Sequence, residues 1–321
     1  MSQLSPQSNL DVLLLTNPAA NRGRAKATGD EVHSYLTRAG HRVQHQVPED
    51  ISITRHMVDE AVSTQKRIIA VGGDGFIHHI VQGCAETGAI LGIVPAGTGN
   101  DFAFGLDLPT SVEQATQAAL TAPVTCDVLK FESQTGKTRY GASIATAGFS
   151  ADVNLKAESL KWPRGSLKYT AATLMKLMRL KRYELQIAVD DAPIEGRCLM
   201  VAIANTRAFG GGMQIAPDAK PSSGTADLVV IRDSSALTLL RMLPKTFKGA
   251  HIEHPAVEVT RGTRFEVNLF EADSSEPCHL RADGEDVGSL PQTVTVVPGG
   301  LRVAGASFGH SPASKTRDTN E

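Results

Sequence analysis

The chain has 321 residues, about twice the length of a typical single domain, so we expect two domains. Hydrophobic residues make up 41% and charged residues 21%, which is ordinary for a globular protein and excludes a fibrous or disordered chain. The formal net charge of −2 offers nucleic acid no basic footprint, so we expect no nucleic-acid partner.

Cysteine usage and the N-terminal segment both favour a cytoplasmic protein. The four cysteines are widely scattered, which fits reduced thiols and neither a disulfide framework nor a zinc site. The segment Met1–Asn9 is polar and lacks the apolar run of a signal peptide. Apolar stretches such as Val12–Leu15 and Ile68–Val71 have the length of a strand and cannot span a membrane. Any membrane contact is therefore expected to be peripheral.

The first 130 residues alternate short apolar runs with helix-like segments, as βαβ units around a parallel sheet do. The predicted strands are Leu10–Thr16, Arg42–Val47, Arg67–Val71 and Ala89–Val94. The predicted helices are Arg24–Ala39, Ile53–Thr64, Phe76–Glu86 and Ser111–Leu120. This pattern predicts an α/β domain with a mainly parallel sheet over residues 10–130.

The pattern then becomes mostly strand-like, which predicts a mainly antiparallel β-sandwich domain over residues 131–291. The predicted strands are Tyr140–Phe149, Tyr183–Asp190, Arg197–Asn205, Ala226–Ile231, Val257–Thr260 and Arg264–Leu269. Two helices, Ser166–Lys181 and Ala236–Phe247, interrupt them. Residues 292–308 hold two apolar segments that fit either domain and so can return to the first. Residues 309–321 are polar and are predicted to form a disordered tail.

Two glycine-rich loops each follow a buried-type strand of the first domain. The first is Gly72-Gly73-Asp74-Gly75, and the second runs from Pro95 to Asp101. Ligands of open α/β sheets bind outside the carboxyl ends of the strands, where both loops would lie. Glycines let backbone N–H groups approach a ligand, and a helix N-terminus adds positive charge, so the loops can cradle phosphate. A side chain on Gly73 is then expected to block phosphate without unfolding the protein.

Each loop also carries a carboxylate, Asp74 in the first and Asp101 in the second. These carboxylates would repel phosphate unless a divalent cation lay between, and Mg²⁺ bound with a nucleotide supplies one. Thr98 offers a hydroxyl to a phosphate oxygen. The alternative is two tight turns in which glycine supplies a positive φ and aspartate caps a helix. Two such loops in one domain favour the functional interpretation.

Other phosphate-binding signatures are absent from the sequence. There is no Walker A loop, no GxGxxG, and no protein-kinase HRD or DFG motif. His78 and His79 are adjacent and diverge on a helix, so we expect a solvated helix start there and not a metal site.

At these residues the sequence resembles the diacylglycerol kinase catalytic family, in particular the bacterial soluble lipid kinases related to the sphingosine kinase and NAD kinase folds. The family pattern has NPxSG near the start, then GGDGT, GTGND, a later Asp, and DGE near the C-terminus. The matching residues are Asn17-Pro18-Ala19-Ala20, Gly72–Gly75, Gly97–Asp101, Asp127 and Asp283-Gly284-Glu285. The order and spacing hold over residues 10–305, and GGDG together with GTGND is specific.

The resemblance implies an N-terminal NAD-kinase-like α/β domain and a C-terminal β-sandwich, with ATP and a lipid substrate such as diacylglycerol meeting in the cleft. The implied nucleotide contacts are Asn17, Gly72, Gly73, Asp74, Gly75, Phe76, Ile77, His78, Thr98 and Gly99. The implied Mg²⁺ network consists of Asp74, Asp101 and Asp127. The implied catalytic residues are Asp74, Asp101 and Glu285, with Glu285 as the base for the substrate hydroxyl. Without the resemblance, Glu285 is typical of an exposed turn acid.

Four residues at three places depart from the family pattern. Phe76 replaces the threonine of GGDGT, which puts an aromatic ring where a polar contact is expected. His78-His79 replaces an Asn-Glu pair, so the hydrogen bonding under the loop must differ. Ser223 stands where members with a structural Mg²⁺ carry an aspartate, and serine is a poor cation ligand, which puts that metal in doubt.

The segment from Ser159 to Tyr183 carries seven basic residues and no acidic one. Its predicted helix places apolar residues on one face and Lys168, Lys176 and Arg179 to one side, which fits docking on anionic lipid. The alternative is a helix packed on the sandwich with a solvated basic edge.

Three alternatives to a diacylglycerol kinase stay open. One is a kinase of another lipid alcohol, such as a sphingoid base or phosphatidylglycerol. A NAD kinase would share GGDG but not GTGND and is disfavoured. A degenerate protein that only binds nucleotide or lipid is disfavoured because Asp74, Thr98, Asp101, Asp127 and Glu285 are retained. The sequence also leaves open whether the chain forms a homodimer.

Overall fold

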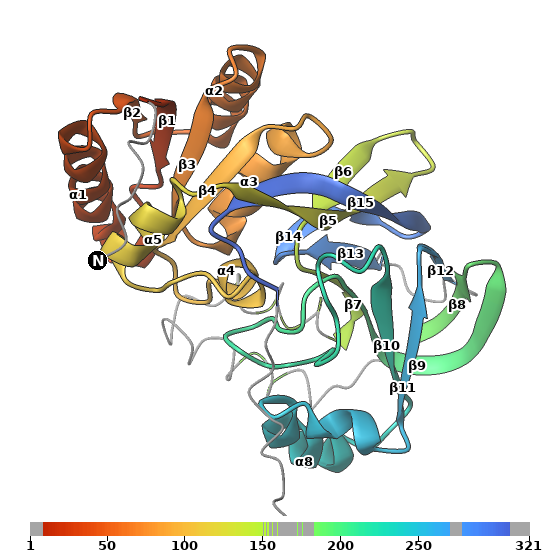
Figure 1. Ribbon diagram of the computed structural model, residues 1–321. Coiled ribbons are helices and arrows are strands. Elements are labelled where there is room, and N and C mark those ends of the chain that lie inside the picture. Colours follow the sequence, from red (N-terminus) through yellow and green to blue (C-terminus); the bar gives the residue numbers. More distant parts are fainter. Residues whose placement is uncertain are drawn as a thin grey trace, which may run out of the picture.

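The computed structural model describes residues 9–149, 183–269 and 278–308, and the single positions 151, 153, 156, 159, 172 and 175. In this part of the chain, strand pairing connects fifteen strands across the molecule. Figure 1 shows the helix-covered parallel strands at one end and the antiparallel strands at the other. Apart from those single positions, the predicted basic helix Ser166–Lys181 lies outside the described residues, and so does the predicted tail 309–321.

Four parallel strands form the N-terminal sheet in the order β4-β3-β1-β2. Their bounds are β1 (Asp11–Thr16), β2 (Arg42–Gln46), β3 (Arg67–Gly72) and β4 (Ile90–Pro95). The helices are η1 (Ala20–Gly23), α1 (Ala25–Arg38), α2 (Ile51–Ser63), α3 (Asp74–Cys84), α4 (Asp101–Gly105) and α5 (Val112–Ala118). Beyond Arg67, every residue of β3 is buried, as in a parallel strand with both faces covered.

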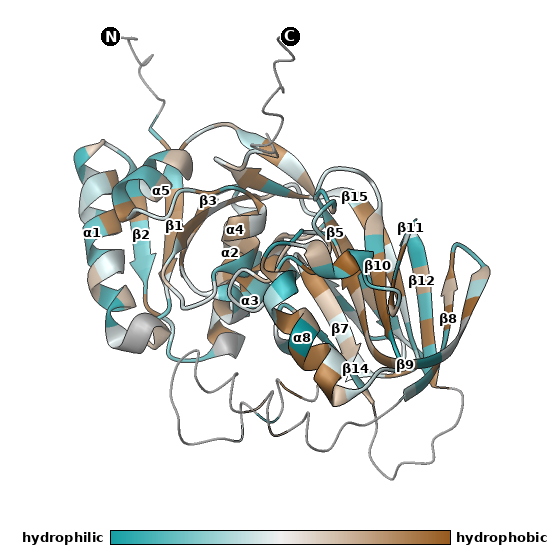
Figure 2. Cartoon of the chain, turned by 90° about the horizontal axis from the view of Figure 1, so that it is seen from below, coloured by the Kyte–Doolittle hydropathy of each residue, from teal (hydrophilic) through white to brown (hydrophobic). Residues whose placement is uncertain are grey.

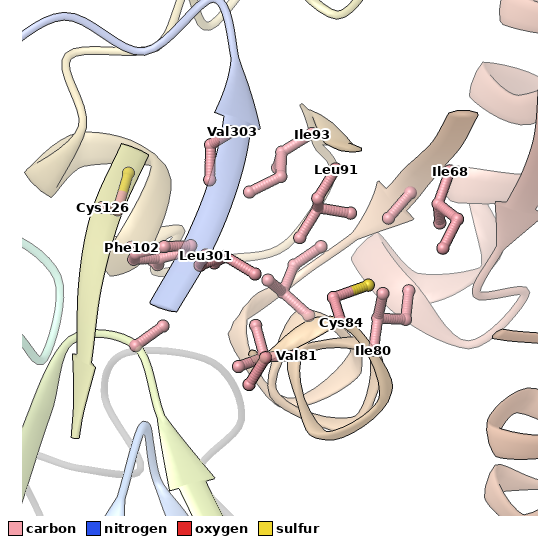
Figure 3. Close-up of a cluster of buried hydrophobic side chains, with 14 of the residues drawn as sticks. Ile68, Ile80, Val81, Cys84, Leu91, Ile93, Phe102, Cys126, Leu301 and Val303 are labelled. Carbon is pink, nitrogen blue, oxygen red and sulfur yellow. The ribbon is translucent and has the colours of Figure 1, made fainter. Parts of the chain in front are cut away.

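Helices cover the two faces of this sheet in pairs. Leu13 and Leu15 of β1 belong to the hydrophobic cluster that also holds buried residues of α2 and α3. Val12 and Leu14 belong to the cluster that holds buried residues of α1 and α5. Because successive strand residues point to opposite faces, the apolar run of β1 contributes buried side chains to both clusters. Figure 3 shows the first cluster, in which Ile80 and Val81 of α3 lie against the strands.

The remaining strands pair mainly antiparallel around a second core. They are β5 (Pro123–Ser133), β6 (Thr138–Gly141), β7 (Ile144–Gly148), β8 (Tyr183–Val189), β9 (Ala192–Ala204), β10 (Ala226–Arg232), β11 (Val257–Gly262), β12 (Arg264–Leu269), β13 (His279–Ala282), β14 (Glu285–Ser289) and β15 (Gln292–Ala304). The described helices of this part are α8 (Ala236–Thr246) and η2 (Ala250–Glu253).

Strand β15 connects the two parts of the molecule. Near its start, Thr295 pairs with Arg264 of β12 in the antiparallel part. Near its end, Arg302 pairs in parallel with Ile90 of β4. Strand β5 runs antiparallel beside β15 over nearly its whole length. The chain therefore re-enters the N-terminal sheet through its last strand.

The predicted fold class, an α/β N-terminal part with a mainly parallel sheet followed by a mainly antiparallel part, is confirmed. Three strands were not predicted, namely β5, β13 and β14, and the single predicted strand Tyr140–Phe149 is two strands, β6 and β7. Strand β5 contains the buried Asp127, which interrupts an apolar pattern. The hairpin of β13 and β14 consists of two short strands on either side of an Asp-Gly turn, too short for a clear period.

Candidate active site

The two glycine loops lie against each other at the carboxyl ends of β3 and β4. The N–H of Ala96 donates to the carbonyl of Gly72 at 2.8 Å. A Cβ on Gly73 would lie 2.9 Å from the Cα of Gly97, which is closer than a real Cβ comes to another atom. This contact corrects the expectation for Gly73, because a side chain there would strike the neighbouring loop and push the two loops apart.

Asn100 gives the second loop its shape. Its φ of 55° lies in the left-handed region, which asparagine tolerates better than most residues. Its side-chain oxygen accepts from the N–H of Gly97 at 2.8 Å, and its amide donates to the carbonyl of Gly97 at 3.2 Å. Thr98 and Gly99, which lie between these two hydrogen-bonded residues, are exposed. The cavity beneath the loops measures only about 10 Å³, which is too small to hold a nucleotide.

The carboxylates of Asp74 and Asp101 converge beside Gly99. A Cβ on Gly99 would lie 2.9 Å from Oδ2 of Asp74 and 3.3 Å from Oδ2 of Asp101. Asp74 is the first residue of α3 and accepts from the N–H of Phe102 at 3.2 Å. Asp101 begins α4, so the end of each strand supplies one carboxylate. The absence of a side chain at Gly99 leaves the space that a cation between them needs.

Burial and the charges of nearby carboxylates raise the pKa values of both groups. Burial, followed by the charge of Asp101, raises the pKa of Asp74 to about 6. Burial also raises the pKa of Asp101, although bonds from the N–H groups of Gly211 and Gly210 oppose the shift. Those bonds measure 2.9 and 2.6 Å and come from a loop of the antiparallel part. Asp101 therefore holds the two parts of the molecule together at the site.

Glu285 reaches the same place from the antiparallel part. It is the first residue of β14, and a Cβ on Gly75 would lie 2.7 Å from its Oε1. Its carboxylate also acts electrostatically on His79 of α3. The predicted base therefore lies over the first turn of α3, where Gly75 follows Asp74 in the chain. The structure brings Asp74, Asp101 and Glu285 together around the glycine loops.

Asp283 and His78 form a buried pair that the sequence did not reveal. His78 Nδ1 lies 3.0 Å from Asp283 Oδ2, and both side chains are 4% exposed. The expectation of a solvated helix start at His78 is therefore wrong, because α3 turns this ring toward the β13–β14 turn. Asp283 also accepts from the N–H groups of Ala142 and Ser143 at 2.9 and 2.8 Å and from the Ser143 hydroxyl at 2.5 Å.

These bonds outweigh the effect of burial on Asp283. Burial alone would raise its pKa, but the bond and charge of His78 and the bonds from Ser143 and Ala142 hold the pKa below its ordinary value. Asp283 lies two residues before Glu285, with a φ of 55° at the head of the turn. The pair therefore anchors the turn that carries Glu285. The one signal in the sequence was the Asp-Gly-Glu motif itself.

Two other residues implied as nucleotide contacts, Phe76 and Ile77, have buried side chains. The side chains of Phe76 and Ile77 are 8% and 4% exposed and belong to the core, so these residues can meet a nucleotide only through their backbone. The Phe76 ring packs on Gly72, where an added Cβ would lie 2.7 Å from it. The N–H of Asn17 donates to the carbonyl of Val71, near the carboxyl end of β3.

Asp127 is buried in β5, and both of its carboxylate oxygens accept backbone hydrogen bonds. The N–H groups of Gly224 and Gly299 donate to them at 2.6 and 2.9 Å. The carboxylates that act electrostatically on Asp74 are those of Asp101 and Asp283. A role for Asp127 in the metal network therefore stays a prediction. Ser223 uses its hydroxyl on local partners, among them the carbonyl of Lys220 at 2.9 Å.

The residues present fit a Mg²⁺ ion that is shared with a bound phosphate. Within the described residues, no three His, Cys, Asp or Glu side chains form a set that could hold an ion by themselves. Mg²⁺ commonly takes one or two protein carboxylates and completes its shell with water and phosphate oxygens. The pair of Asp74 and Asp101 beside the open space at Gly99 supplies that number.

Two family models match the chain, the diacylglycerol kinase catalytic domain over residues 11–131 and the YegS C-terminal NAD kinase beta sandwich-like domain over residues 143–305. The chain is 32% identical over 296 residues to a Mycobacterium tuberculosis protein named diacylglycerol kinase, covering 91% of this chain and 94% of that protein. A Bacillus subtilis protein of the same name is 28% identical over 288 residues, covering 87% and 90%.

A crystal structure of a diacylglycerol kinase from Bacillus anthracis has the same fold. It matches with a TM-score of 0.74 at 20% identity and covers 92% of this chain and 96% of that chain. The fold, the paired loops and the matched models define a lipid kinase. More narrowly, the chain belongs to the diacylglycerol kinase family, and the resemblance drawn from its motifs is confirmed. No helix in the described part of the chain is long and apolar enough to cross a membrane.

Proposed function

We propose that the protein transfers the γ-phosphate of ATP to the hydroxyl of diacylglycerol or a similar lipid alcohol. The observation that carries the proposal is the convergence of Asp74, Asp101 and Glu285 on two glycine loops that touch each other. The acceptor is supported by the name diacylglycerol kinase, which relatives of 32% and 28% identity bear.

The loops supply the phosphate site. Gly73 precedes α3, an 11-residue helix whose N-terminus favours an anion, and Gly97–Gly99 lies beside it. The exposed Thr98 can donate its hydroxyl to a phosphate oxygen. Backbone N–H groups do most of this binding, which agrees with the buried side chains of Phe76 and Ile77.

Asp74 and Asp101 would hold Mg²⁺ against the phosphates. An ion held there would supply positive charge to offset the charge that spreads over the transferred phosphoryl group in a loose transition state. Loss of the ion leaves two close carboxylates with raised pKa values, so binding of the ion and ionisation of Asp74 support each other.

Glu285 accepts the proton of the lipid hydroxyl as that oxygen attacks the γ-phosphorus and the bond from this phosphorus to the β,γ-bridging oxygen breaks, which releases ADP. A base of this kind contributes about 10²–10⁴-fold in rate. Asp283 and His78 are positioning residues, because they fix the turn that carries Glu285 and are too deeply buried to meet a substrate.

The departures at Phe76 and His78 do not favour an inactive protein. Both side chains are buried, at 8% and 4% exposure, and each has a defined place in the core or in the bond to Asp283. The surface of the loops is therefore formed by the same glycines and aspartates as in the family motif.

The proposal is tested with γ-labelled ATP, Mg²⁺ and a panel of lipid alcohols in detergent micelles, with mass analysis of the product. The panel contains diacylglycerol, a sphingoid base and phosphatidylglycerol. We expect a phosphorylated product from diacylglycerol that requires Mg²⁺ and is lost in Glu285→Gln. Transfer to another lipid alcohol alone would reassign the acceptor, and the absence of label in every lipid would refute the proposal.

A further inference from the structure

The outer face of α8 leaves large apolar side chains in contact with solvent. Leu237, Leu240 and Phe247 are 54%, 45% and 52% exposed, and they are three of the seven large hydrophobic residues with such exposure in the described structure. A surface that gathers large apolar residues commonly marks a place where a partner binds.

The three residues lie on one stripe of the helix. With 3.6 residues per turn, Leu240 and Phe247 are almost in line, and Leu237 and Pro244 lie within about 80° of them. On the opposite side, Met242 and Thr246 are buried against the domain. The helix thus uses one face for the fold and leaves a second apolar face outward. Figure 2 shows brown and teal stretches side by side on α8.

Basic residues flank the exposed stripe on one side. Arg241, Lys245 and Lys248 are exposed, and no acidic residue occurs between Ala236 and Gly249. None of the three forms a salt bridge with another described residue. We name this surface, formed by Leu237, Leu240, Arg241, Pro244, Lys245, Phe247 and Lys248, the α8 face.

We infer that the α8 face docks the protein on an anionic membrane surface. Such a surface has an apolar layer of acyl chains beneath a layer of anionic headgroups. The leucines and the phenylalanine would enter the boundary of the acyl chains, and the cations at the edge of the stripe would contact the headgroup phosphates. A second copy of the chain is a poorer match. A two-fold contact would bring the same three cations from each copy to one interface, and the segment 236–249 has no acid to meet them.

The α8 face is joined to the candidate active site through one short loop. The N–H of Gln214 donates to the carbonyl of Thr246 at 2.8 Å, at the end of α8. Four residues earlier in the same loop, Gly210 donates to Asp101. In Figure 1, α8 lies at the lower edge of the antiparallel part, below β7 and β10. Docking through α8 would therefore bring the antiparallel side of the site toward the layer in which a lipid hydroxyl lies.

The inference rests on the proposed lipid substrate for its choice of partner, so binding is measured apart from catalysis. Vesicles of phosphatidylcholine, with and without phosphatidylserine, are sedimented with the full chain in the absence of ATP and of any lipid alcohol. Leu237→Gln/Leu240→Gln removes two of the three exposed apolar side chains, and Arg241→Gln/Lys245→Gln removes two of the three cations. Ile53→Gln on α2 and Lys26→Gln on α1 are the matched controls, since both residues are exposed elsewhere.

The wild type is expected to bind the vesicles with phosphatidylserine more tightly than those without. The leucine variant should lose roughly tenfold or more at every salt concentration. The cation variant should lose about fivefold for each charge at low salt and little at high salt. Both controls should bind as the wild type does, and circular dichroism should show that every variant is folded.

Equal binding by the α8 variants and the wild type would overturn the inference, and so would a wild type that does not bind. It would also be overturned if sedimentation without lipid showed a dimer that only the leucine variant abolishes while vesicle binding stays intact. An assay of lipid phosphorylation in micelles by the α8 variants distinguishes a failure of the docking inference from a failure of the proposed function. Active variants that fail only on vesicles support docking, and inactivity of the wild type in micelles refutes the function alone.

Discussion

Two regions of the molecule bury carboxylates, and the pKa values of these carboxylates shift in opposite directions. At the ends of β3 and β4, Asp74 has few donors, and burial together with the charge of Asp101 raises its pKa to about 6. At the turn between β13 and β14, Asp283 is more deeply buried but bonds to His78 and Ser143, and its pKa lies below the ordinary value. The donors around a carboxylate, and not burial alone, decide whether it is a fixed structural anion or is left to meet a cation.

The largest effect is expected at Glu285, which shares a turn with Asp283 but has a different role. Glu285→Gln keeps the shape and hydrogen bonding of the side chain but cannot accept a proton at neutral pH. We expect kcat to fall about 10²–10⁴-fold while the affinity for ATP changes little. Steady-state kinetics and calorimetry measure the two quantities. A variant with near-normal kcat on its true substrate would show that Glu285 is only a turn residue.

Removal of Asp283 should damage the fold itself. Asp283→Ala leaves the N–H groups of Ala142 and Ser143 and the ring of His78 without their acceptor in a buried site. We expect the free energy of unfolding to fall by about 3–5 kcal/mol, as when one partner of a buried pair is deleted. Urea unfolding measures this loss. Asp283→Asn keeps one acceptor oxygen and should lose less, so equal losses would contradict the assigned bonds.

Removal of the Asp74 charge should stabilise the metal-free protein, whereas removal of Asp283 is expected to destabilise it. The folded pKa of about 6 lies above the unfolded value of 3.8, so the native state binds more protons between these values and loses stability as the pH rises through them. Above about pH 6 the cost of the buried charge is fully present. Asp74→Asn should then gain up to about 3 kcal/mol in EDTA.

The pH dependence separates this gain from other effects of the Asp74→Asn substitution. At about pH 3, well below the unfolded pKa of 3.8, the wild-type carboxyl is largely neutral in both states, so the gain should nearly vanish there. Thermal unfolding in EDTA at the two ends of this range tests the sign. The same variant should lose activity that added Mg²⁺ partly restores. A destabilised Asp74→Asn protein at high pH would show that Asp74 is held like Asp283.

The smallest effects are expected at two glycines that differ in what a Cβ would meet. At Gly73 it would meet the backbone of Gly97, so Gly73→Ala should cost about 1–3 kcal/mol of stability as well as ATP affinity. At Gly75 it would meet only the carboxylate of Glu285, a side chain that can move. Gly75→Ala should therefore lower kcat while the free energy of unfolding stays within about 0.5 kcal/mol. Equal stability of the two variants would refute the contact between the loops.

Much of the N-terminal part could be predicted from local sequence. Strands β1, β3 and β4 are apolar runs, and the loops are marked by glycines and aspartates within a few residues of β3 and β4. Asp74 and Asp101 could therefore be predicted from these local motifs, and Glu285 from the family pattern. Strand β5 was missed because the buried Asp127 interrupts its apolar pattern, and the short strand β13 was missed because it also pairs with β7, which is distant in the sequence.

The sequence by itself determined that two glycine loops with carboxylates follow parallel strands, because a buried strand and a tight turn each depend on residues that are adjacent in the chain. Tertiary structure decided what those residues meet. His78 and Asp283 are 205 positions apart, and Gly210 bonds to Asp101 across 109 positions. Such contacts depend on how the strands are ordered in the sheet, and so does the face of α8 that is left outside. Composition and periodicity carry no record of that order, so the chemistry of the loops could be predicted and the anchoring of Glu285 could not.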